Sequence, residues 1–480
     1  MKKLATFPIV LLLVSVVAMQ TAKAEEPARQ QPVKHVTKTK TYQRIKNAVD
    51  QIWIIDTHEH LQDEYRYLKR PADFLAMLNY VASDLISSGM TFEQLRYIQD
   101  QKVPLPKRWE VFQKYWKEIR FTGYSRAIRR SIQDLYGIDV DTLTPETAHL
   151  LNEKIVAAHK PGIYRHVLKD KARIDLSIVD RNSVTPTPGL FVQVRRFDNF
   201  VNIFNSKKLN SLAKLTGMKI DSLEDLCRAL ETQFEKDTNK PGVVAVKSAL
   251  AYDRRIFYPL PTEAQAKAAF DKVKSGKPVP YAEILPLQNY MMHQICKLAE
   301  KHDLPFQFHT GLQTGSGNTI TNSKPTDLVS LISKYPKVKF VIFHGSYPYG
   351  HELSTIAKNF PNAYIDMCWL HIISPKISRD SLSEWLETVP ANKITCFGGD
   401  YNTIESVYGH AEMAREAVAE VLAEKVLRGY LTEAEACELA VKLLRNNAID
   451  IYQLKLPEKT TPADEKKNDA KKDDASPAKK

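Results

Sequence analysis

Six side chains that can bind metal ions or transfer protons follow short apolar runs in the sequence. In chain order they are His58, His60, Lys247, His309, His344 and Asp400. Side chains two residues apart on a strand point the same way, so the imidazoles of His58 and His60 can reach one metal ion while Glu59 points elsewhere. Imidazole nitrogens with a carboxylate suit Zn²⁺, Mn²⁺ or Fe²⁺ better than Ca²⁺. The set therefore predicts a centre for one or two divalent ions, with zinc as the first choice.

The carboxylate of Asp400 has two predicted roles at this centre. A divalent ion lowers the pKa of a bound water molecule from 15.7 to about 7. A carboxylate beside that water can accept its proton, so Asp400 is predicted to be both a metal ligand and the general base. This chemistry suits the hydrolysis of a small polar substrate.

Lys247 admits two interpretations. An ammonium group cannot bind a cation, but a carbamate formed from CO₂ and the neutral amine would be a bridging ligand for two metal ions. Burial near a metal lowers the pKa of a lysine and favours the neutral amine that this reaction needs. Alternatively, Lys247 stays cationic and pairs with a substrate anion or with an acid behind the metal ligands.

The elements that must position these residues are strands and helices in alternation between residues 48 and 455. The apolar runs are 52–56, 173–180, 189–195, 242–252, 304–311, 339–345, 363–370 and 393–400. Several lack strict alternation, as expected of parallel strands buried on both faces. Eight such strands predict an α/β fold, a (β/α)₈ barrel of the TIM type, whose active sites lie at the carboxyl ends of the strands. The interval 61–172 predicts a large helical insertion after the first strand.

The two ends of the chain differ in composition from this body. Residues 1–24 combine a basic start, an apolar run and small residues before a cleavage point, which is the pattern of an export signal. The protein is therefore expected to be periplasmic or secreted. A polar leader, residues 25–47, follows the signal. The tail, residues 456–480, has almost no apolar side chains and is predicted to be disordered.

Charge, hydropathy and cysteine content argue against other classes of protein. The 480 residues carry 68 Lys and Arg against 56 Asp and Glu, a formal net charge of +12 that is concentrated near the start. The body is only mildly basic, which argues against nucleic-acid binding. No later segment reaches the roughly 18 uninterrupted apolar residues of a membrane span. The 5 cysteines are scattered singly and predicted to be inert thiols, although Cys368 and Cys396 lie in neighbouring strands and could form one bridge. The oligomeric state is left open.

Four motifs in order resemble those of the amidohydrolase superfamily: IIDTHEHL, FQFHTG, FHGSYPYGHE and FGGD. More closely they resemble the amidohydrolase-related branch found joined to glutamine synthetase-like domains, with the uronate isomerases as more distant relatives. The resemblance covers residues 52–454. It implies a metal-dependent barrel with His58, His60, His309 and Asp400 as ligands. It also implies that His344 is a further ligand or a group that polarises an oxyanion.

The sequence departs from the pattern of this branch in the predicted substrate pocket, so the substrate does not follow from the resemblance. For example, Asp253 follows Tyr252, where the branch has an arginine directly after Ala-Tyr. The candidate substrate contacts are Arg195, Tyr252, Arg254, Tyr347 and Trp369. A cluster of arginines would favour an acidic substrate.

Three functions follow from these observations. The leading one is an exported metal-dependent hydrolase that cleaves a C–N or C–O bond in a small polar substrate. The second is a sugar acid isomerase similar to uronate isomerase, in which the metal orients two substrate oxygens. The third is a non-catalytic binding protein that retains the metal site, and the intact base Asp400 argues against it.

Overall fold

Eight parallel strands form one sheet in the order in which they occur along the chain. The strands are β1 (Ile54–Glu59), β2 (Ile174–Val179), β3 (Phe191–Arg196), β4 (Val243–Ser248), β5 (Phe306–Phe308), β6 (Phe340–Ile342), β7 (Ala363–Asp366) and β8 (Ile394–Thr395). Each overlaps one of the eight apolar runs, and the α/β barrel predicted from the sequence is confirmed. This computed structural model describes residues 35–181 and 189–456. The predicted export signal lies outside the described residues, as does the predicted tail except for its first residue.

The sheet is closed by the segment that follows β8. The amide of Thr57 donates to the carbonyl of Phe397 at 3.0 Å, the amide of Asp400 donates to His58 at 2.8 Å, and the amide of His60 donates to Tyr401 at 2.9 Å. The chain around Asp400 is therefore hydrogen-bonded along its length to β1. This pairing brings the residues of the first and last predicted metal-binding motifs together.

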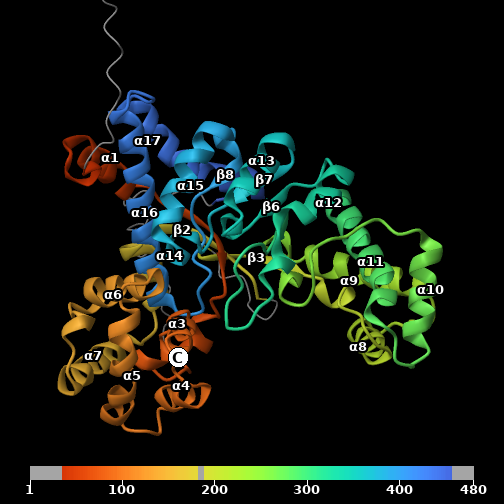
Figure 1. The fold of residues 1–480 in the computed structure, drawn as a ribbon, viewed down its shortest axis with the longest axis horizontal. Helices are drawn as coiled ribbons and strands as arrows, with labels where there is room; N and C mark the ends of the chain where they lie inside the picture. Colours follow the sequence, from red (N-terminus) through yellow and green to blue (C-terminus); the bar gives the residue numbers. More distant parts are fainter. Residues whose placement is uncertain (1–34, 182–188, 457–480) are drawn as a thin grey trace, which may run out of the picture. The chain divides into compact units, whose positions relative to one another are not determined.

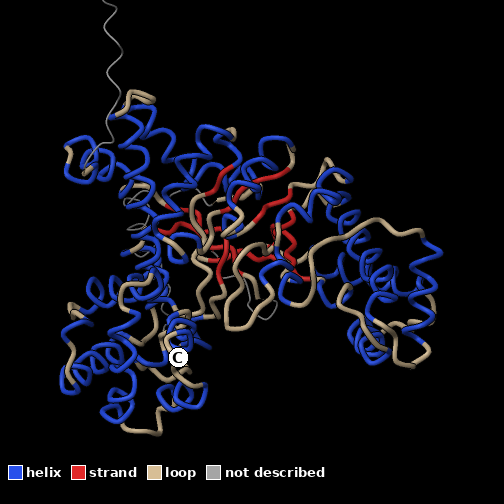
Figure 2. Tube along the Cα trace, in the orientation of Figure 1, coloured by secondary structure: helices blue, strands red, loops and turns tan. Residues whose placement is uncertain are grey.

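Helices surround the strands, as Figures 1 and 2 show. After β3 the chain forms α8 (Ser206–Thr216), α9 (Leu223–Thr238), α10 (Glu263–Lys274), α11 (Tyr281–Lys301), α12 (Val329–Lys334), α13 (Gly350–Asn359), α14 (Leu370–Ile373), α15 (Pro375–Thr388), α16 (Ile404–Leu427), α17 (Glu433–Val441) and α18 (Asn447–Tyr452). None of the helices within the described ranges is long and apolar enough to cross a membrane. All five cysteines are free thiols, so the bridge considered between Cys368 and Cys396 is not formed.

The segment between β1 and β2 is helical. It contains α2 (Glu64–Tyr67), α3 (Val81–Ser87), α4 (Phe92–Gln99), α5 (Leu105–Ile119), α6 (Gly123–Tyr136), α7 (Pro145–Ala158) and a π-helical stretch, Arg165–Lys171. Helix α6 crosses α16 closely, because Gly409 has no side chain there. A Cβ atom on Gly409 would lie 2.1 Å from the carbonyl oxygen of Ala127. Ser131 of α6 also donates a hydrogen bond to the carbonyl of Glu405 at 2.7 Å.

Helix α1 (Lys40–Asp50) begins before the predicted start of the folded body. Its Ile45 and Val49 are fully buried. The buried guanidinium of Arg415 in α16 donates to the carbonyls of Val49, Ile52 and Ala172 at 2.5, 2.9 and 2.9 Å. The predicted leader, residues 25–47, therefore ends inside a packed helix, and its boundary at residue 47 is corrected. A short amphipathic helix with few apolar residues looks like a polar linker in the sequence.

Candidate active site

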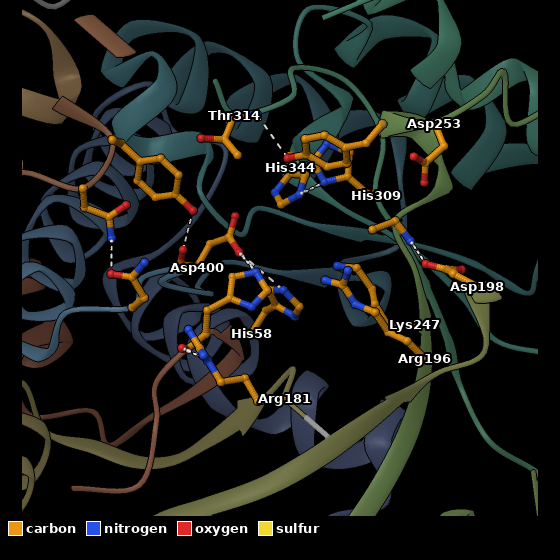
Figure 3. Close-up of a pocket in the computed structure, with 16 residues that line it drawn as sticks. His58, Arg181, Arg196, Asp198, Lys247, Asp253, His309, Thr314, His344 and Asp400 are labelled. Carbon is orange, nitrogen blue, oxygen red and sulfur yellow. Dashed lines mark hydrogen bonds and ion pairs between the residues drawn. The ribbon is translucent and has the colours of Figure 1, made fainter. Parts of the chain in front are cut away.

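A cavity of about 600 Å³ lies at the carboxyl ends of the strands, and Figure 3 shows the side chains around it. Its lining consists of His58, His60, Asn79, Tyr80, Arg181, Arg196, Asp198, Lys247, Ala249, Tyr252, Asp253, His309, Thr314, His344, Asp400 and Asn402. All six residues that the sequence singled out for metal or proton chemistry are among them. They come from five different strands or the segments directly after them. The helical segment after β1 contributes Asn79 and Tyr80, so it forms part of the wall.

His58, His60 and Asp400 meet at one side of the cavity. The Oδ1 atom of Asp400 lies 3.4 Å from Nε2 of His58 and 3.1 Å from Nε2 of His60. Burial acts to raise the pKa of Asp400, but the contact with His60 and the neighbouring imidazoles outweigh it and hold this pKa well below 3.8. Asp400 is therefore an ionised carboxylate between two imidazoles. This is a donor set that suits a divalent transition metal.

His309 and His344 form a second pair of imidazoles in contact. Nδ1 of His309 lies 2.8 Å from Nε2 of His344. The other nitrogen of each ring faces a backbone carbonyl, that of Leu312 at 3.0 Å and that of Cys368 at 3.1 Å. Burial lowers the pKa of His344 to about 4 and the pKa of His309 well below 6.5, so both rings are neutral at pH 7.

This second pair provides a test of whether the residues fit a metal ion. A neutral imidazole has one N–H, and the two carbonyls, of Leu312 and Cys368, can only accept hydrogen bonds. When those carbonyls take both protons, Nδ1 of His309 and Nε2 of His344 present lone pairs to each other. Imidazoles that bind metals are held in this way, with the far N–H bonded to a carbonyl. The arrangement therefore fits a cation at this end of the cavity.

Two further groups of potential ligand atoms involve residues that sequence reasoning did not select. The ligand atoms of His58, His60 and Asp180 lie within 4.8 Å of one another. The same holds for His344, Cys368 and Asp400. Burial raises the pKa of the Cys368 thiol, so this thiol is protonated. Asp180 ends the predicted run 173–180, so the rule that selected the other strand ends applies to it as well.

Asp180 is paired with Arg196 across the neighbouring strand ends. Nε of Arg196 donates to both carboxylate oxygens of Asp180, at 2.9 and 2.7 Å. Burial acts to raise the pKa of Asp180, and the guanidinium charge of Arg196 outweighs it, so this pKa is lowered. The positive charge of Arg196 is thus largely compensated within the protein. Asp180 Oδ2 also lies 3.7 Å from Nε2 of His58.

Lys247 is buried at the cavity wall, which it shares with the two histidine pairs. Its Nζ is buried, has no hydrogen-bond partner among the residues that the structure describes, and lies 3.8 Å from the ring centre of Phe343. Burial lowers the pKa of Lys247 to about 8, partly opposed by the charges of Asp180 and Asp400. A fraction of the amine is therefore neutral near pH 8. This environment is compatible with both interpretations of Lys247 that the sequence left open.

The five candidate substrate contacts have different locations. Tyr252 lines the cavity, and its hydroxyl accepts a hydrogen bond from the amide of Thr314 at 3.1 Å. The other four, Arg195, Arg254, Tyr347 and Trp369, are not among the cavity-lining residues. Arg195 precedes Arg196 on β3, and adjacent residues of a strand point to opposite faces, so only Arg196 faces the cavity.

Arg254 and Trp369 serve the packing around the cavity. The guanidinium of Arg254 is buried and donates to Gln288 and Asn289 of α11, both at 2.8 Å. Trp369 is buried and stacks on Tyr124 of α6 with ring centres 5.9 Å apart. The carbonyl of Tyr347 accepts the amide of Leu312 at 2.7 Å. This bond holds the loop after β5, which carries His309.

The fold and the donor set define a class, the metal-dependent (β/α)₈ barrel enzymes. An amidohydrolase family model matches residues 251–454, and a glucuronate isomerase family model matches residues 168–327. The protein fluG of Emericella nidulans is 31% identical over 229 residues, which are 45% of this chain. The chain spans only 26% of that curated relative. These similarities support the resemblance to the amidohydrolase superfamily, with the uronate isomerases as more distant relatives, that the sequence motifs predicted.

Solved structures show the same fold over nearly the whole chain. Uronate isomerase from Thermotoga maritima is 19% identical, with a TM-score of 0.71, and the match covers 86% of this chain and 97% of that one. Glucuronate isomerase from Caulobacter crescentus is 17% identical, with a TM-score of 0.73 and coverage of 88% and 96%. A presumed metal-dependent hydrolase from Lactobacillus casei is 17% identical, with a TM-score of 0.59 and coverage of 85% and 97%.

Proposed function

We propose that this protein is an exported, metal-dependent hydrolase that cleaves a C–N or C–O bond in a small polar substrate. The observation that carries the proposal is the position of Asp400, an ionised carboxylate whose Oδ1 lies 3.4 and 3.1 Å from the Nε2 atoms of two histidines in a cavity of about 600 Å³. Export rests on the pattern of residues 1–24. The centre would hold zinc, with manganese or iron as alternatives, as one or two ions.

The residues of the chain would divide the work as follows. His58, His60, His309 and Asp400 would hold the ion, which would supply Lewis acidity and lower the pKa of a water molecule. The carboxylate of Asp400 would accept the proton of the attacking water and pass it to the leaving group. His344, held by the Cys368 carbonyl at 3.1 Å, would polarise the substrate oxygen or act as a further ligand. Lys247 would bridge two ions as a carbamate or remain a cation near the substrate.

Arg181 favours an acidic substrate. Its guanidinium lines the cavity, and its Nε donates to the carbonyl of His60 at 2.5 Å. Arg196, in contrast, already pairs with Asp180. A guanidinium that lines a cavity is suited to bind a carboxylate through charge-assisted hydrogen bonds. The sequence pointed to arginines for this role, and Arg181 meets the requirement better than Arg195 or Arg254.

The test compares metal-free and metal-loaded protein on a panel of amides, esters and lactones that carry a carboxylate. Proton release measured with a pH indicator reports hydrolysis of the esters and lactones. Amide hydrolysis gives a carboxylate and an ammonium ion near neutral pH, so it is followed by detecting the released amine. The proposal expects turnover that disappears on chelation and returns with added zinc, manganese or iron. Turnover that survives complete removal of metal would contradict it.

A second candidate is an isomerase of sugar acids. Its support is that uronate and glucuronate isomerases match 86% and 88% of the chain with TM-scores of 0.71 and 0.73. In that reaction the same carboxylate would move a proton between two carbon atoms of the substrate. Circular dichroism of uronic acids distinguishes this reaction, because aldose–ketose conversion changes the optical signal without releasing protons. Conversion of a uronate with no activity on the hydrolysis panel would favour the isomerase.

A further inference from the structure

We propose that Glu59, the residue between the two histidines of β1, is a positioning residue that fixes the backbone of Asp400. The proposal rests on the proposed function in one respect, since it takes Asp400 as the ligand and general base. In the sequence Glu59 is the member of the motif that points away from the metal. The structure shows what it points toward, which is the turn after β8.

Asp400 has a backbone conformation that needs support from its surroundings. Its φ angle is +62°, in the left-handed region, where residues other than glycine are uncommon and carry strain. Its amide donates to the carbonyl of His58 at 2.8 Å, and its carbonyl accepts the hydroxyl of Tyr80. The backbone N–H and C=O groups of Asp400 are thus both hydrogen-bonded, and these bonds hold this conformation.

The residues on either side of Asp400 are held by two carboxyl groups of β1. The amide of Gly399 donates to Oδ1 of Asp56 at 3.1 Å. The amide of Tyr401 donates to Oε2 of Glu59 at 2.7 Å. Because these two bonds flank the strained residue, they fix the direction in which its side chain leaves the backbone.

Glu59 also fills the space beneath the turn. A Cβ atom on Gly399 would lie 1.8 Å from Oε1 of Glu59, so the carboxyl is packed directly against the glycine backbone. Glu59 is itself completely buried. Its carboxyl contacts that of Asp56, which ties the two holding groups to each other. The pairing of β1 with β2 shifts register between Asp56 and Glu59, and this irregularity lets both carboxyls face the turn.

The role assigned to Glu59 is specific to the turn. Removing the carboxyl frees the Tyr401 amide and opens a space under Gly399, so Asp400 can relax away from the two histidines. A glutamine at this position would keep an oxygen to accept the Tyr401 amide and an NH₂ group to donate to Asp56. We therefore expect Glu59→Ala to disturb the site and Glu59→Gln to preserve it.

Two measurements on the full-length protein test this role, one with metal and one without. In the first, metal-free protein is titrated with Co²⁺, and the visible absorption bands report affinity and ligand geometry. Groups that orient metal ligands typically contribute about 10–100-fold in metal affinity. We expect Glu59→Ala to weaken Co²⁺ binding by about this factor and to change the bands, while Glu59→Gln stays within about threefold of wild type.

In the second measurement, amide hydrogen exchange of the peptide around residues 397–403 is followed in metal-free protein. Glu59→Ala should accelerate exchange there, whereas Glu59→Gln should not. The matched control is Asp73→Ala, which removes another buried carboxyl that binds Arg108 at 2.9 and 2.6 Å in the helical segment. This control should lower stability and leave both the Co²⁺ bands and the 397–403 exchange unchanged.

Each outcome decides the proposal. A folded Glu59→Ala protein with wild-type exchange at 397–403 would overturn it, and so would wild-type Co²⁺ bands and affinity. If Asp73→Ala disturbed the bands as much as Glu59→Ala, the effect would be general destabilisation, and the proposal would also fall. A wild-type protein that binds no Co²⁺ would contradict the proposed function, while the exchange experiment alone would still decide the role of Glu59.

Discussion

The substitution Asp400→Asn separates the two roles of this carboxylate. The amide is the same size and keeps one oxygen at the position that lies 3.4 and 3.1 Å from the two histidine nitrogens. It loses the negative charge and cannot accept a proton near neutral pH. Since one oxygen can still bind the ion, metal content should fall less than after loss of either histidine.

The expected loss of turnover follows from the proton-transfer role. General acid–base catalysis contributes about 10²–10⁴-fold. At about 1.36 kcal/mol for each factor of ten, this range corresponds to about 3–5 kcal/mol of transition-state stabilisation. The assay measures kcat on the best substrate of the panel, together with metal content by elemental analysis and folding by circular dichroism. We expect a protein that is folded, partly metal-loaded and nearly inactive.

Wild-type turnover in Asp400→Asn would refute this reasoning. The base would then be another group in the cavity, and His344 is the next candidate because it is neutral and faces His309 at 2.8 Å. A variant that loses its metal completely would instead show that the charge of Asp400 is needed for binding. The comparison with metal content separates these two results.

Three further predictions concern stability and specificity. Gly409→Ala should lower the free energy of unfolding by about 1–3 kcal/mol through overpacking, because the new methyl group would lie 2.1 Å from the carbonyl oxygen of Ala127. Chemical denaturation measures this change, and Gly350→Ala, at a helical glycine with more space around it, is the control. Deleting the chain from Pro457 onward should leave the melting temperature within about 2 °C, in keeping with changes away from buried features, and a larger drop would show that the tail packs on the body. Arg181→Gln should raise KM at least about tenfold for a carboxylate substrate, because a charge-assisted pair with the carboxylate is lost. The effect on KM for the neutral amide of the same substrate should be much smaller, and equal effects on both would argue against anion binding.

Much of the barrel could be predicted because buried parallel strands leave a strong pattern in the sequence. Apolar runs such as 339–345 carry a polar residue, here His344, at or near their carboxyl end, and the carboxyl ends of barrel strands meet at one site. This reasoning predicted that His58 and His60 meet Asp400, although they lie far apart in the sequence. The same reasoning applies to Asp180, which ends the apolar run 173–180.

Other features depend on packing that a sequence does not display. Arg195 and Arg196 are adjacent and chemically identical, and only the register of β3 decides that Arg196 faces the cavity. Glu59 gives no sign of its contact with Gly399, because that contact joins residues more than 300 positions apart. Most of helix α1 resembles a polar leader in the sequence, because only Ile45 and Val49 of its residues are buried.

The central claim is that His58 and His60 bind a divalent metal at the end of β1. The most direct test is the metal content of purified wild-type protein and of the His58→Ala/His60→Ala double variant, measured by elemental analysis after both are exposed to equal zinc. Because metal–ligand free energies are large, removing two ligands should sharply lower the bound metal. We expect stoichiometric metal in the wild type and little or none in a folded double variant. Full metal occupancy in the double variant would contradict it.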